Sequence, residues 1–541
     1  MLNEEVIDIN RIPYGNPEFS DIRERNKIYV DKTELIYKIA HQDSPIFFSR
    51  PRRFGKSLLV NTLHSLFENG LKYFYGLDIE KVWNDKIYQV VHLDFSIMGE
   101  KNSDELKRAL GDIIIQEFNV KNKVHLYDQE GVRDPSIIIN EILKTLANNS
   151  VVLLIDEYDS PLTRHLNENE ELKNIIKVLN DFYSTIKQYT GKFRLIFITG
   201  VTRTSHVSIF SAFNNLLDIS LDEEFNPILG FTQENLEKYF NNYIEKIAKD
   251  LDIGKDDIYQ RLEQYYDGFQ FSLNTKQTLY NPWSVLSFLR NYKKGFSNYW
   301  FESGGSSSLI MNYLKISDSF NLLKYKDRKI YKTKKELASR YEIDNIPIEI
   351  LLFQAGYFTL RKESNQIARL VFPNTEVEDS MLDLYFSANN IKISRDVQAH
   401  FDTLSENIDQ KNLSEIISIF NNILNDCVSI LSRIFEDERS IRDIIYAALP
   451  QEFYIQKIKE RETLKGFSDL ELLTKKTHMV IEFKRTTNTR DAKASLAEAV
   501  SQLKNKKYGI GSFQNRKLYR VAMVISTNDK AILPEYCQEV L

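Results

Sequence analysis

The sequence predicts an α/β fold with a parallel sheet flanked by helices, then a mostly helical stretch, then a smaller α/β domain. Three observations support this. Short apolar runs alternate with helical patterns from residue 46 to about residue 225. The pattern turns helical after Phe231, and two further strand patterns follow near residues 469 and 482. Alternating strands and helices are typical of parallel sheets with helices on their faces.

The first half contains five strand candidates. They are Ile46 to Ser49, Val90 to Phe95, Val151 to Ile155, Leu195 to Thr199, and Leu216 to Ile219, after one N-terminal helix from Asp31 to Ala40. Ligands of such sheets bind beyond the carboxyl ends of the strands. Ser49, Asp156 and Thr199 stand at those ends. We therefore expect one polar site along this edge of the sheet.

The loop after the first strand predicts phosphate binding. The apolar run Ile46 to Phe48 precedes it, Gly55-Lys56-Ser57 closes it, and a helical pattern follows. Backbone N–H groups at a helix N-terminus hold anionic oxygens. Lys56 is expected to reach the outer phosphates of ATP, and Ser57 to bind Mg²⁺. Arg50 stands where a first glycine is usual, so a basic turn that caps a helix is the alternative. The predicted nucleotide-binding residues here are Arg53, Phe54, Gly55, Lys56, Ser57 and Leu58.

Two carboxylates end the third strand. Val151 to Ile155 is followed directly by Asp156 and Glu157. In nucleotide-hydrolysing folds the first acid of such a pair joins the Mg²⁺ shell, and the second polarises the attacking water. Asp156 is thus a predicted metal ligand and Glu157 a predicted catalytic base. The alternative is a strand that ends in a solvated acidic turn.

The next strand ends in Thr199, and Arg203 follows shortly after. This arrangement suits a sensor of the γ-phosphate, so both residues are predicted to contact the nucleotide. Arg203 is equally well explained as an ordinary surface arginine.

These motifs together resemble the AAA-ATPase-like family of prokaryotic P-loop proteins over roughly residues 5 to 300. The resemblance includes the N-terminal Tyr29 to Thr33 and the lid motifs Tyr266 to Phe269 and Tyr280 to Ser284. The family has its own loop variant, Arg-Pro-Arg-Arg-Phe-Gly-Lys-Ser, which runs here from Arg50 to Ser57. Members often carry a C-terminal nuclease-like domain of the PD-(D/E)xK type.

Near the C-terminus, Asp469 lies in one strand pattern and Glu482-Phe483-Lys484 in the next. A turn at Thr474 to Thr477 would make the two strands antiparallel neighbours, so that both carboxylates converge on one divalent ion. Hard oxygen ligands suit Mg²⁺ or Mn²⁺, which activates water for phosphodiester hydrolysis. Lys484 shares a face with Glu482 and is expected to orient the water or neutralise developing charge.

This segment resembles the PD-(D/E)xK nuclease fold, given Gly466 ahead of Asp469 and a helix with Gln502 after the second strand. The resemblance implies a metal-associated glutamate on the preceding helix, and Glu438 matches that position loosely. It also implies that Gln502 supports the site. The alternative for Gln502 is an ordinary exposed helix residue.

The charge distribution predicts a polyanion partner for this domain. Between Ile455 and Arg520 there are 16 Lys and Arg residues against 7 Asp and Glu residues, while the whole chain has a net charge of −5. A basic domain on an acidic chain is typical of nucleic-acid binding. The alternative is a solvated basic face. The phosphate-contacting candidates are Lys504, Lys506, Lys507, Arg516, Lys517 and Arg520.

The remaining organisation follows from pattern and composition. We predict an ATPase core at residues 1–228, a helical lid at 229–300 with Thr232 as a helix N-cap, a mostly helical middle region at 301–430, and a nuclease-like domain at 431–541. Strand-like pieces occur at Tyr357 to Arg361 and Ala368 to Phe372, and an apolar stripe from Asn412 to Phe435 is expected to pack against the rest of the chain.

Cysteine usage and leader signals bound the location. The two cysteines, Cys427 and Cys537, lie far apart, which argues against a zinc site or a disulfide framework. No basic leader and no run of 18 apolar residues is seen, so we expect a cytoplasmic protein without membrane contact.

The predicted function is an ATP-dependent switch joined to a metal-dependent nuclease that acts on DNA or RNA, and antiviral defence is one setting for it. One alternative is a nucleic-acid-binding ATPase whose nuclease fold is inactive. The other is a nucleotide-gated switch whose partner is a protein. A homo-oligomer is also open, with an arginine from a neighbour, or Arg52 or Arg53 in cis, acting at the γ-phosphate.

Overall fold

The computed structural model describes residues 8–118, 127–128, 131–132, 134–204, 215–303, 307–316, 329–388, 395–427, 438–449, 456–463, 466–510 and 516–540. The chain divides into two compact units. The first comprises Met1–Tyr292, Asn298–Phe320 and Asp327–Glu378, and the second comprises Lys293–Ser297, Asn321–Lys326 and Asp379–Leu541. The finer four-part division stays a prediction.

A five-stranded parallel sheet organises the first unit. Its order is β2-β5-β6-β1-β7, with every neighbouring pair parallel. The strands are β1 Ile46–Ser49, β2 Gln89–Asp94, β5 Val151–Asp156, β6 Phe193–Gly200 and β7 Leu217–Asp218. All five predicted strands are present, and the predicted fold class is confirmed. Because β6 lies between β1 and β5, the carboxyl end of β6 lies between the loop that follows β1 and the acidic residues that end β5.

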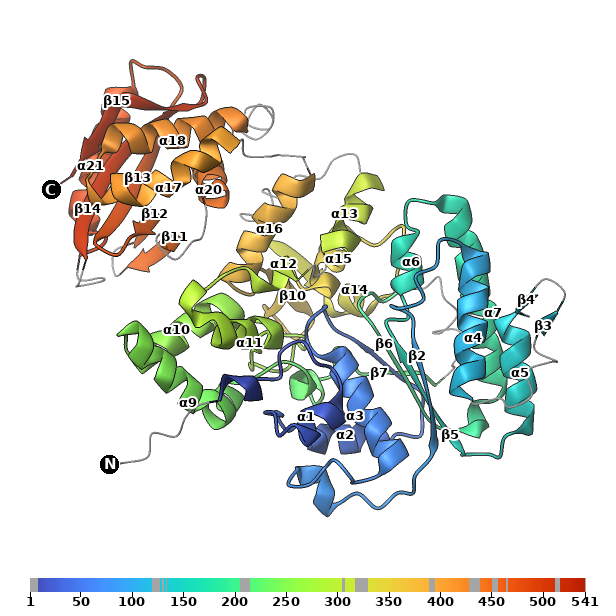
Figure 1. Cartoon of the computed structure of the whole chain (residues 1–541). Coiled ribbons are helices and arrows are strands. Elements are labelled where there is room, and N and C mark those ends of the chain that lie inside the picture. Colours follow the sequence, from blue (N-terminus) through green and yellow to red (C-terminus); the bar gives the residue numbers. More distant parts are fainter. Residues whose placement is uncertain are drawn as a thin grey trace, which may run out of the picture. The chain divides into compact units, whose positions relative to one another are not determined.

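Helices cover both faces of this sheet. Accordingly, β1 and β5 are buried along their whole length. Figure 1 shows α3 (Lys56–Asn69) on one side and α4 (Ser103–Glu117) with α7 (Asn169–Gln188) on the other. Each presents an apolar stripe inward, as amphipathic helices do. The other helices of this part are α1 Phe19–Glu24, α2 Thr33–Ala40, α5 Pro135–Thr145 and α6 Ser160–Arg164. A separate two-stranded sheet is formed by β3 Tyr127–Asp128 and β4 Gly131–Val132. Short 3₁₀ turns occur at Ile9–Arg11, Asp78–Lys81, Thr190–Lys192 and Asn226–Ile228.

The predicted lid is helical, with α9 Gln233–Leu251, α10 Lys255–Tyr266 and α11 Pro282–Asn291. Thr232 is the N-cap of α9, as predicted. Its hydroxyl accepts from the Asn235 N–H at 3.2 Å, and the Asn235 side chain accepts from the Thr232 N–H at 3.1 Å. This reciprocal pair is a capping box, which satisfies two otherwise unpaired donors.

The rest of the first unit combines short helices with a three-stranded antiparallel sheet of order β8-β10-β9. The sequence predicts β9 (Thr359–Lys362) and β10 (Ile367–Val371) but not β8 (Ile330–Thr333). The helices are α12 Tyr299–Glu302, α13 Ser307–Ile316, α14 Lys334–Ala338 and α15 Ile348–Ala355. The helix α16 (Thr375–Ala388) and a 3₁₀ turn at Tyr292–Lys294 begin in the first unit and continue into the second.

The second unit is built on a five-stranded sheet of order β11-β12-β13-β14-β15. Only the β13–β14 pair is parallel. A parallel pair needs a crossover, which α21 (Ala492–Lys506) supplies. The strands are β11 Gln456–Thr463, β12 Gly466–Leu473, β13 Thr477–Thr486, β14 Lys517–Ser526 and β15 Ala531–Glu539, and the predicted turn at residues 474–477 is confirmed.

The two faces of this sheet carry different packing. One face packs a large apolar cluster with α17 (Arg395–Asp409), α18 (Leu413–Asp426) and α20 (Glu438–Ala448), and the other packs a smaller cluster with α21. The predicted apolar stripe on α18 lies in the larger cluster, together with Cys427, so it packs internally as expected. The end of that stripe, residues 428–435, lies outside the described residues.

Candidate functional site

The loop between β1 and α3 has the tight geometry of a phosphate-binding loop. Gly55 adopts φ +100° directly before α3 and Arg53 adopts φ +69°, both in the left-handed region. Glycine accepts this conformation without steric cost, whereas a residue with a Cβ does not. Successive N–H groups in such turns form a concave site for anions.

Lys56, the first residue of α3, lies across this loop. Its ammonium group donates to the carbonyl oxygens of Arg50 at 3.0 Å and Pro51 at 3.2 Å, and the residue is only 4% exposed. Burial lowers the pKa of Lys56, while the nearby carboxylates Glu157 and Asp156 oppose that shift. The cation is therefore held at the position that the sequence predicts.

Arg50 occupies the place of the usual glycine for a structural reason. Its guanidinium is buried and donates to the carbonyl oxygens of Ser49 at 3.0 Å and Ser220 at 2.5 Å. It also stacks on the rings of Phe48 and Phe271, at 4.5 and 4.2 Å from their centroids. Burial lowers the pKa of Arg50 to about 9. The side chain thus ties β1 to the segment after β7 and to the lid.

The two acids at the end of β5 have different environments. Asp156 is 1% exposed and accepts hydrogen bonds from the Thr199 hydroxyl and, at 3.0 Å, from the Glu157 N–H. Thr199 at the end of β6 therefore orients Asp156. Glu157 adopts φ +49°, and burial raises the pKa of its carboxyl group while Lys56 and Arg52 lower it. A carboxylate of raised pKa is a stronger base than an ordinary glutamate, which suits a role in accepting a proton.

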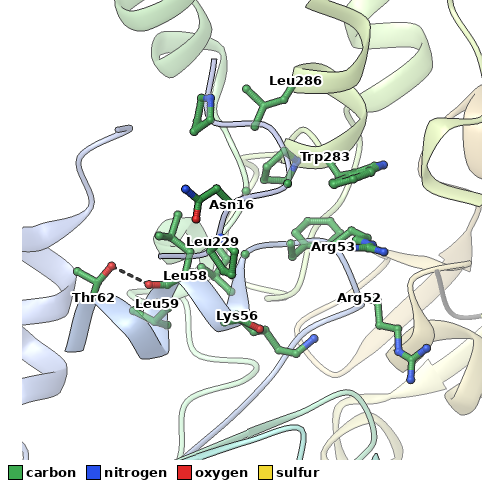
Figure 2. A pocket seen from close by; sticks show the side chains of 18 of the residues that line it. Asn16, Arg52, Arg53, Lys56, Leu58, Leu59, Thr62, Leu229, Trp283 and Leu286 are labelled. Carbon is green, nitrogen blue, oxygen red and sulfur yellow. Dashed lines mark hydrogen bonds between the residues drawn. The ribbon is translucent and has the colours of Figure 1, made fainter. Parts of the chain in front are cut away.

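A cavity of about 720 Å³ lies beside the loop and Glu157, whereas Asp156 and Thr199 are not among its lining residues. Lys56, Ser57 and Glu157 line it together, and so do Arg53, Phe54, Gly55 and Leu58 of the predicted nucleotide-binding set. Figure 2 shows Trp283 and Leu286 of α11 beside the loop, and the Tyr14 and Trp283 rings lie 4.7 Å apart between centroids. A volume of this size and a mixed apolar and charged lining are typical of cofactor sites.

The second site is an antiparallel strand pair in the C-terminal unit. Leu470 of β12 pairs with Ile481 of β13, which sets Asp469 beside Glu482. The Phe483 N–H donates to Asp469 Oδ2 at 2.8 Å, and Lys484 Nζ donates to Glu482 Oε1 at 3.2 Å. The structure thus brings together the three residues that the sequence predicts as catalytic here.

Comparison with known proteins agrees with the two predicted domain types. Residues 13–210 match the family model described as predicted AAA-ATPase, and residues 436–535 match that of the PD-(D/E)XK nuclease superfamily. Both predicted resemblances are confirmed. The chain is also similar to an "Uncharacterized protein in vnfD 5'region" of Azotobacter chroococcum mcd 1, with 29% identity over 387 residues, which is 69% of either chain.

Within the ATPase-like part, Arg203 lies in a different environment from the one predicted. Its side chain, 6% exposed, forms an ion pair with Asp218 and donates to the Leu337 carbonyl at 3.0 Å. Among the described residues it is not one that lines the 720 Å³ cavity. Its assignment as a γ-phosphate sensor stays a prediction.

Arg53 makes contacts that the loop motif does not reveal. It stacks on the Trp283 ring at 4.6 Å from the centroid and donates to Ser303, at 2.8 Å to its carbonyl and 3.2 Å to its hydroxyl. The loop is therefore linked to α11 and to the segment after α12. Arg52, labelled beside Lys56 in Figure 2, lines the cavity as well.

Sequence reasoning missed the N-terminal wall of the cavity. Tyr14, Asn16 and Lys32 all line it. The Lys32 ammonium donates to the Asn235 side chain at 2.7 Å, and burial lowers the pKa of Lys32 to about 8. The Tyr29 to Thr33 motif was the available signal, but nothing in the sequence places it against the lid.

In the nuclease-like part, Gln502 contacts the site through a neighbour. Its amide donates to the Tyr508 hydroxyl at 3.3 Å. Burial raises the pKa of Tyr508, and Glu482 and Asp469 act in the same direction. Tyr508 is thus influenced by the charges of both carboxylates and is contacted by Gln502. The supporting role of Gln502 stays a prediction. Sequence reasoning did not predict a role for Tyr508.

The helix ahead of the strand pair contributes a residue other than the expected glutamate. Glu438 begins α20, but its side chain lies outside the described residues. Arg442, one turn further, is buried at 2% side-chain exposure. Its guanidinium lies 3.5 Å from Asp469 Oδ1 and 3.0 Å from Asp443 Oδ1. The sequence shows Arg442 only as one charge on an amphipathic helix.

The chemistry of these side chains fits divalent cations that keep part of their water shell. In the described part of the chain, no group of three or more His, Cys, Asp and Glu residues is arranged to hold a metal ion. Mg²⁺ commonly takes one or two carboxylates, with water and phosphate oxygens completing its shell. Ser57 with Asp156, and Asp469 with Glu482, match that requirement. No helix of the described residues has the length and apolarity of a membrane span.

Proposed function

We propose that the chain binds and hydrolyses ATP with Mg²⁺, and that this activity controls a metal-dependent nuclease acting on DNA or RNA. The observation that supports it best is the single cavity that holds Lys56, Ser57 and Glu157 together. The Asp469, Glu482 and Lys484 arrangement supports the nuclease half. We further propose that the protein acts in the cytoplasm. By analogy with other pairings of an ATPase with a nuclease, we propose a role in antiviral defence.

In the proposed ATPase reaction, the loop N–H groups and Lys56 hold the β- and γ-phosphates. Ser57 and Asp156 would hold Mg²⁺, which supplies charge neutralisation when bound. Glu157 accepts a proton from the attacking water, which its raised pKa favours. Tyr14, Trp283 and Leu286 supply apolar surface for the base.

In the proposed nuclease reaction, Asp469 and Glu482 would hold Mg²⁺ or Mn²⁺, which lowers the pKa of water when bound. The Phe483 N–H and Arg442 fix the Asp469 carboxylate. Lys484, 14% exposed and paired with Glu482, places a positive charge where the phosphodiester oxygens develop charge.

The nucleic-acid partner is proposed to contact the basic surface of the second unit. Lys504, Lys506, Lys507 and Lys517 are exposed, so their ammonium groups can neutralise phosphates. The expectation for Arg520 is wrong, because it is only 9% exposed and donates to the Leu503 carbonyl at 3.1 Å. Arg516 is partly buried and donates to the Thr474 carbonyl at 2.5 Å.

One observation favours the alternative of an inactive nuclease fold. The Arg442 guanidinium already contacts the Asp469 carboxylate, and a buried cation beside a metal ligand competes with the metal for that charge. In this case the second unit would bind nucleic acid or a protein without cutting. The ATPase assignment is unaffected.

Purified full-length protein distinguishes these cases on a mixed panel of DNA and RNA, single- and double-stranded, with ATP and metal varied independently. Cleavage that requires Mg²⁺ or Mn²⁺ and is lost in Asp469→Asn supports the nuclease. Nucleic-acid binding that persists in Asp469→Asn, with no cleavage by the parent under any condition, supports the inactive fold. A salt-insensitive complex with protein, and none with nucleic acid, supports the protein-gated switch.

A further inference from the structure

The lid carries a second cavity, separate from the nucleotide cavity. It has a volume of about 650 Å³ and lies between α9, α10 and the segment that leads to α11. Its lining includes the acidic residues Glu237, Asp256, Glu263 and Asp267 and the aromatic residues Tyr259 and Tyr280. Nothing in the proposed ATPase or nuclease chemistry uses this cavity.

The cavity has a strong excess of negative charge. Four carboxylates line it, against one ammonium group, that of Lys255. Lys255 is engaged elsewhere, because it forms a 3.0 Å ion pair with Glu245, which does not line the cavity. The acidic side chains are thus left to attract a cation from solution.

Asp267 provides a second, independent indication of a ligand. It lines the cavity, is only 8% exposed, and its Oδ1 atom has no donor within standard hydrogen-bond geometry among the described residues. Burial raises the pKa of this carboxyl group, and the Gly268 N–H and the Thr278 hydroxyl oppose that shift. Its other oxygen accepts from the Thr278 hydroxyl at 2.8 Å. A buried carboxylate oxygen without a donor is costly, so a donor supplied by a ligand would stabilise it.

The backbone fixes Asp267 in this position. Its N–H donates to the Glu263 carbonyl at 3.2 Å, and its carbonyl accepts from the Asn374 amide at 2.6 Å. Gly268, which follows, has φ +95°, and a Cβ there would lie 2.1 Å from the Pro373 carbonyl oxygen. A carboxylate held this rigidly loses little entropy when it binds a ligand.

The two tyrosines complete a wall that suits an organic cation. The Tyr280 hydroxyl donates to the Gln233 side chain at 2.7 Å, and that of Tyr259 donates to Asn241 at 3.3 Å. Burial and the carboxylates of Glu237 and Glu245 raise the pKa of Tyr259 to about 12, so the phenol stays neutral. The ammonium group of Lys255, on the same helix, lies 6.0 Å from the centroid of the Tyr259 ring.

The positions of the carboxylates in the cavity indicate which class of ligand it can bind. In the described part of the chain no three acidic side chains are close enough to hold a metal ion. Glu237 comes from α9, Asp256 and Glu263 come from α10, and Asp267 directly follows α10. They face a cavity large enough for a small molecule. We propose that this lid cavity binds an organic polycation, with alkylammonium groups that pair with Glu237, Glu263 and Asp267. This proposal does not depend on the proposed function.

Titration calorimetry of full-length protein without nucleotide, at low salt, tests it. The probes are spermidine, a tri-lysine peptide and Mg²⁺. We expect a polyamine or peptide to bind, and the double variant Glu237→Gln/Glu263→Gln to weaken that binding about tenfold, because it removes two of the three carboxylates that pair with the ligand. Whichever of the first two probes binds more tightly identifies the source of the ammonium groups.

Glu170→Gln on α7 is the control, because it removes an exposed carboxylate that lies outside the cavity, and it should leave binding nearly unchanged. Asp267→Asn should weaken binding as well. If the Asp267→Asn variant does not fold, the Glu237→Gln/Glu263→Gln variant tests the proposal without it. Equal affinity in the double variant and the parent overturns the proposal. So does Mg²⁺ binding that is tighter than that of either ammonium probe and is lost in the double variant.

Discussion

A single arginine explains why the phosphate loop departs from the usual glycine pattern. Arg50 is buried, stacks between Phe48 and Phe271, and donates to carbonyl oxygens of the chain beyond β7. A buried guanidinium requires such partners, because an unpaired one is very costly. Arg53 and Gly55 then supply the left-handed turn ahead of Lys56. The loop is thus anchored by a side chain where other loops rely on a flexible backbone.

At Glu157 we predict loss of ATP hydrolysis without loss of ATP binding. Glu157→Gln removes the proposed base but keeps the shape of the cavity, so turnover should fall at least about 100-fold. Because the pKa of Glu157 is raised, parent turnover should decline on acidification at a higher pH than an ordinary glutamate would give. Steady-state rates across pH, with separate measurement of ATP binding, check both. A pH-independent rate with full activity in the variant contradicts the assignment.

At Arg442 we predict coupled losses of stability and of metal affinity. Removal of one partner from a buried ion pair costs about 3–5 kcal/mol. In an active nuclease, loss of a residue that orients a metal ligand also weakens metal binding about 10- to 100-fold. In the inactive fold, where Arg442 competes with the metal, its loss leaves metal binding unchanged or strengthens it. Arg442→Lys should retain more of both properties than Arg442→Gln. Mn²⁺ titration and circular dichroism measure them, with the exposed Lys493→Gln as control. If Asp469→Asn weakens Mn²⁺ binding and Arg442→Gln does not, Arg442 has no positioning role.

At the scale of elements, Gly268 is predicted to be indispensable to the lid. Gly268→Ala meets both a left-handed φ of +95° and the Pro373 carbonyl at 2.1 Å, so we expect a loss of about 2 kcal/mol or more. Gly191→Ala, which meets no atom within 4 Å, should change stability by less than about 0.5 kcal/mol. The three tryptophans, Trp83, Trp283 and Trp300, all lie in the first unit, so their fluorescence during urea unfolding reports this difference. Equal stabilities would contradict the geometry.

The elements also show where sequence patterns succeed and fail. The core strands were predictable because a fully buried strand such as β5 needs a continuous apolar run. β8 was not, because its side chains alternate between exposed and half-buried and carry little apolar signal. The candidate site residues at strand ends and in loop motifs were also predictable, because their positions follow from the neighbouring stretch of sequence. Arg442 and Lys32 were not, because their roles depend on contacts with segments that lie far along the chain.

At the scale of the whole molecule, two phosphate-directed sites occur in two separate compact units of one chain. Lys56 belongs to the first unit and Lys484 to the second, and each lies beside carboxylates that fit a divalent ion. The proposed control of one by the other is a claim about the intact chain. It therefore needs variants that silence one site and leave the other folded.

Reciprocal single variants of the intact chain provide that test. Lys56→Ala should abolish ATP turnover, because the cation that holds the outer phosphates is lost, while the exposed Lys72→Ala serves as its control. Asp469→Ala and Lys484→Ala should abolish cleavage and leave ATP turnover within about twofold of the parent, because sites in separate units contribute independently. Control of the nuclease by ATP requires in addition that Lys56→Ala changes the cleavage rate. Cleavage that is identical in Lys56→Ala and parent, with and without ATP, would leave two active sites without the proposed coupling.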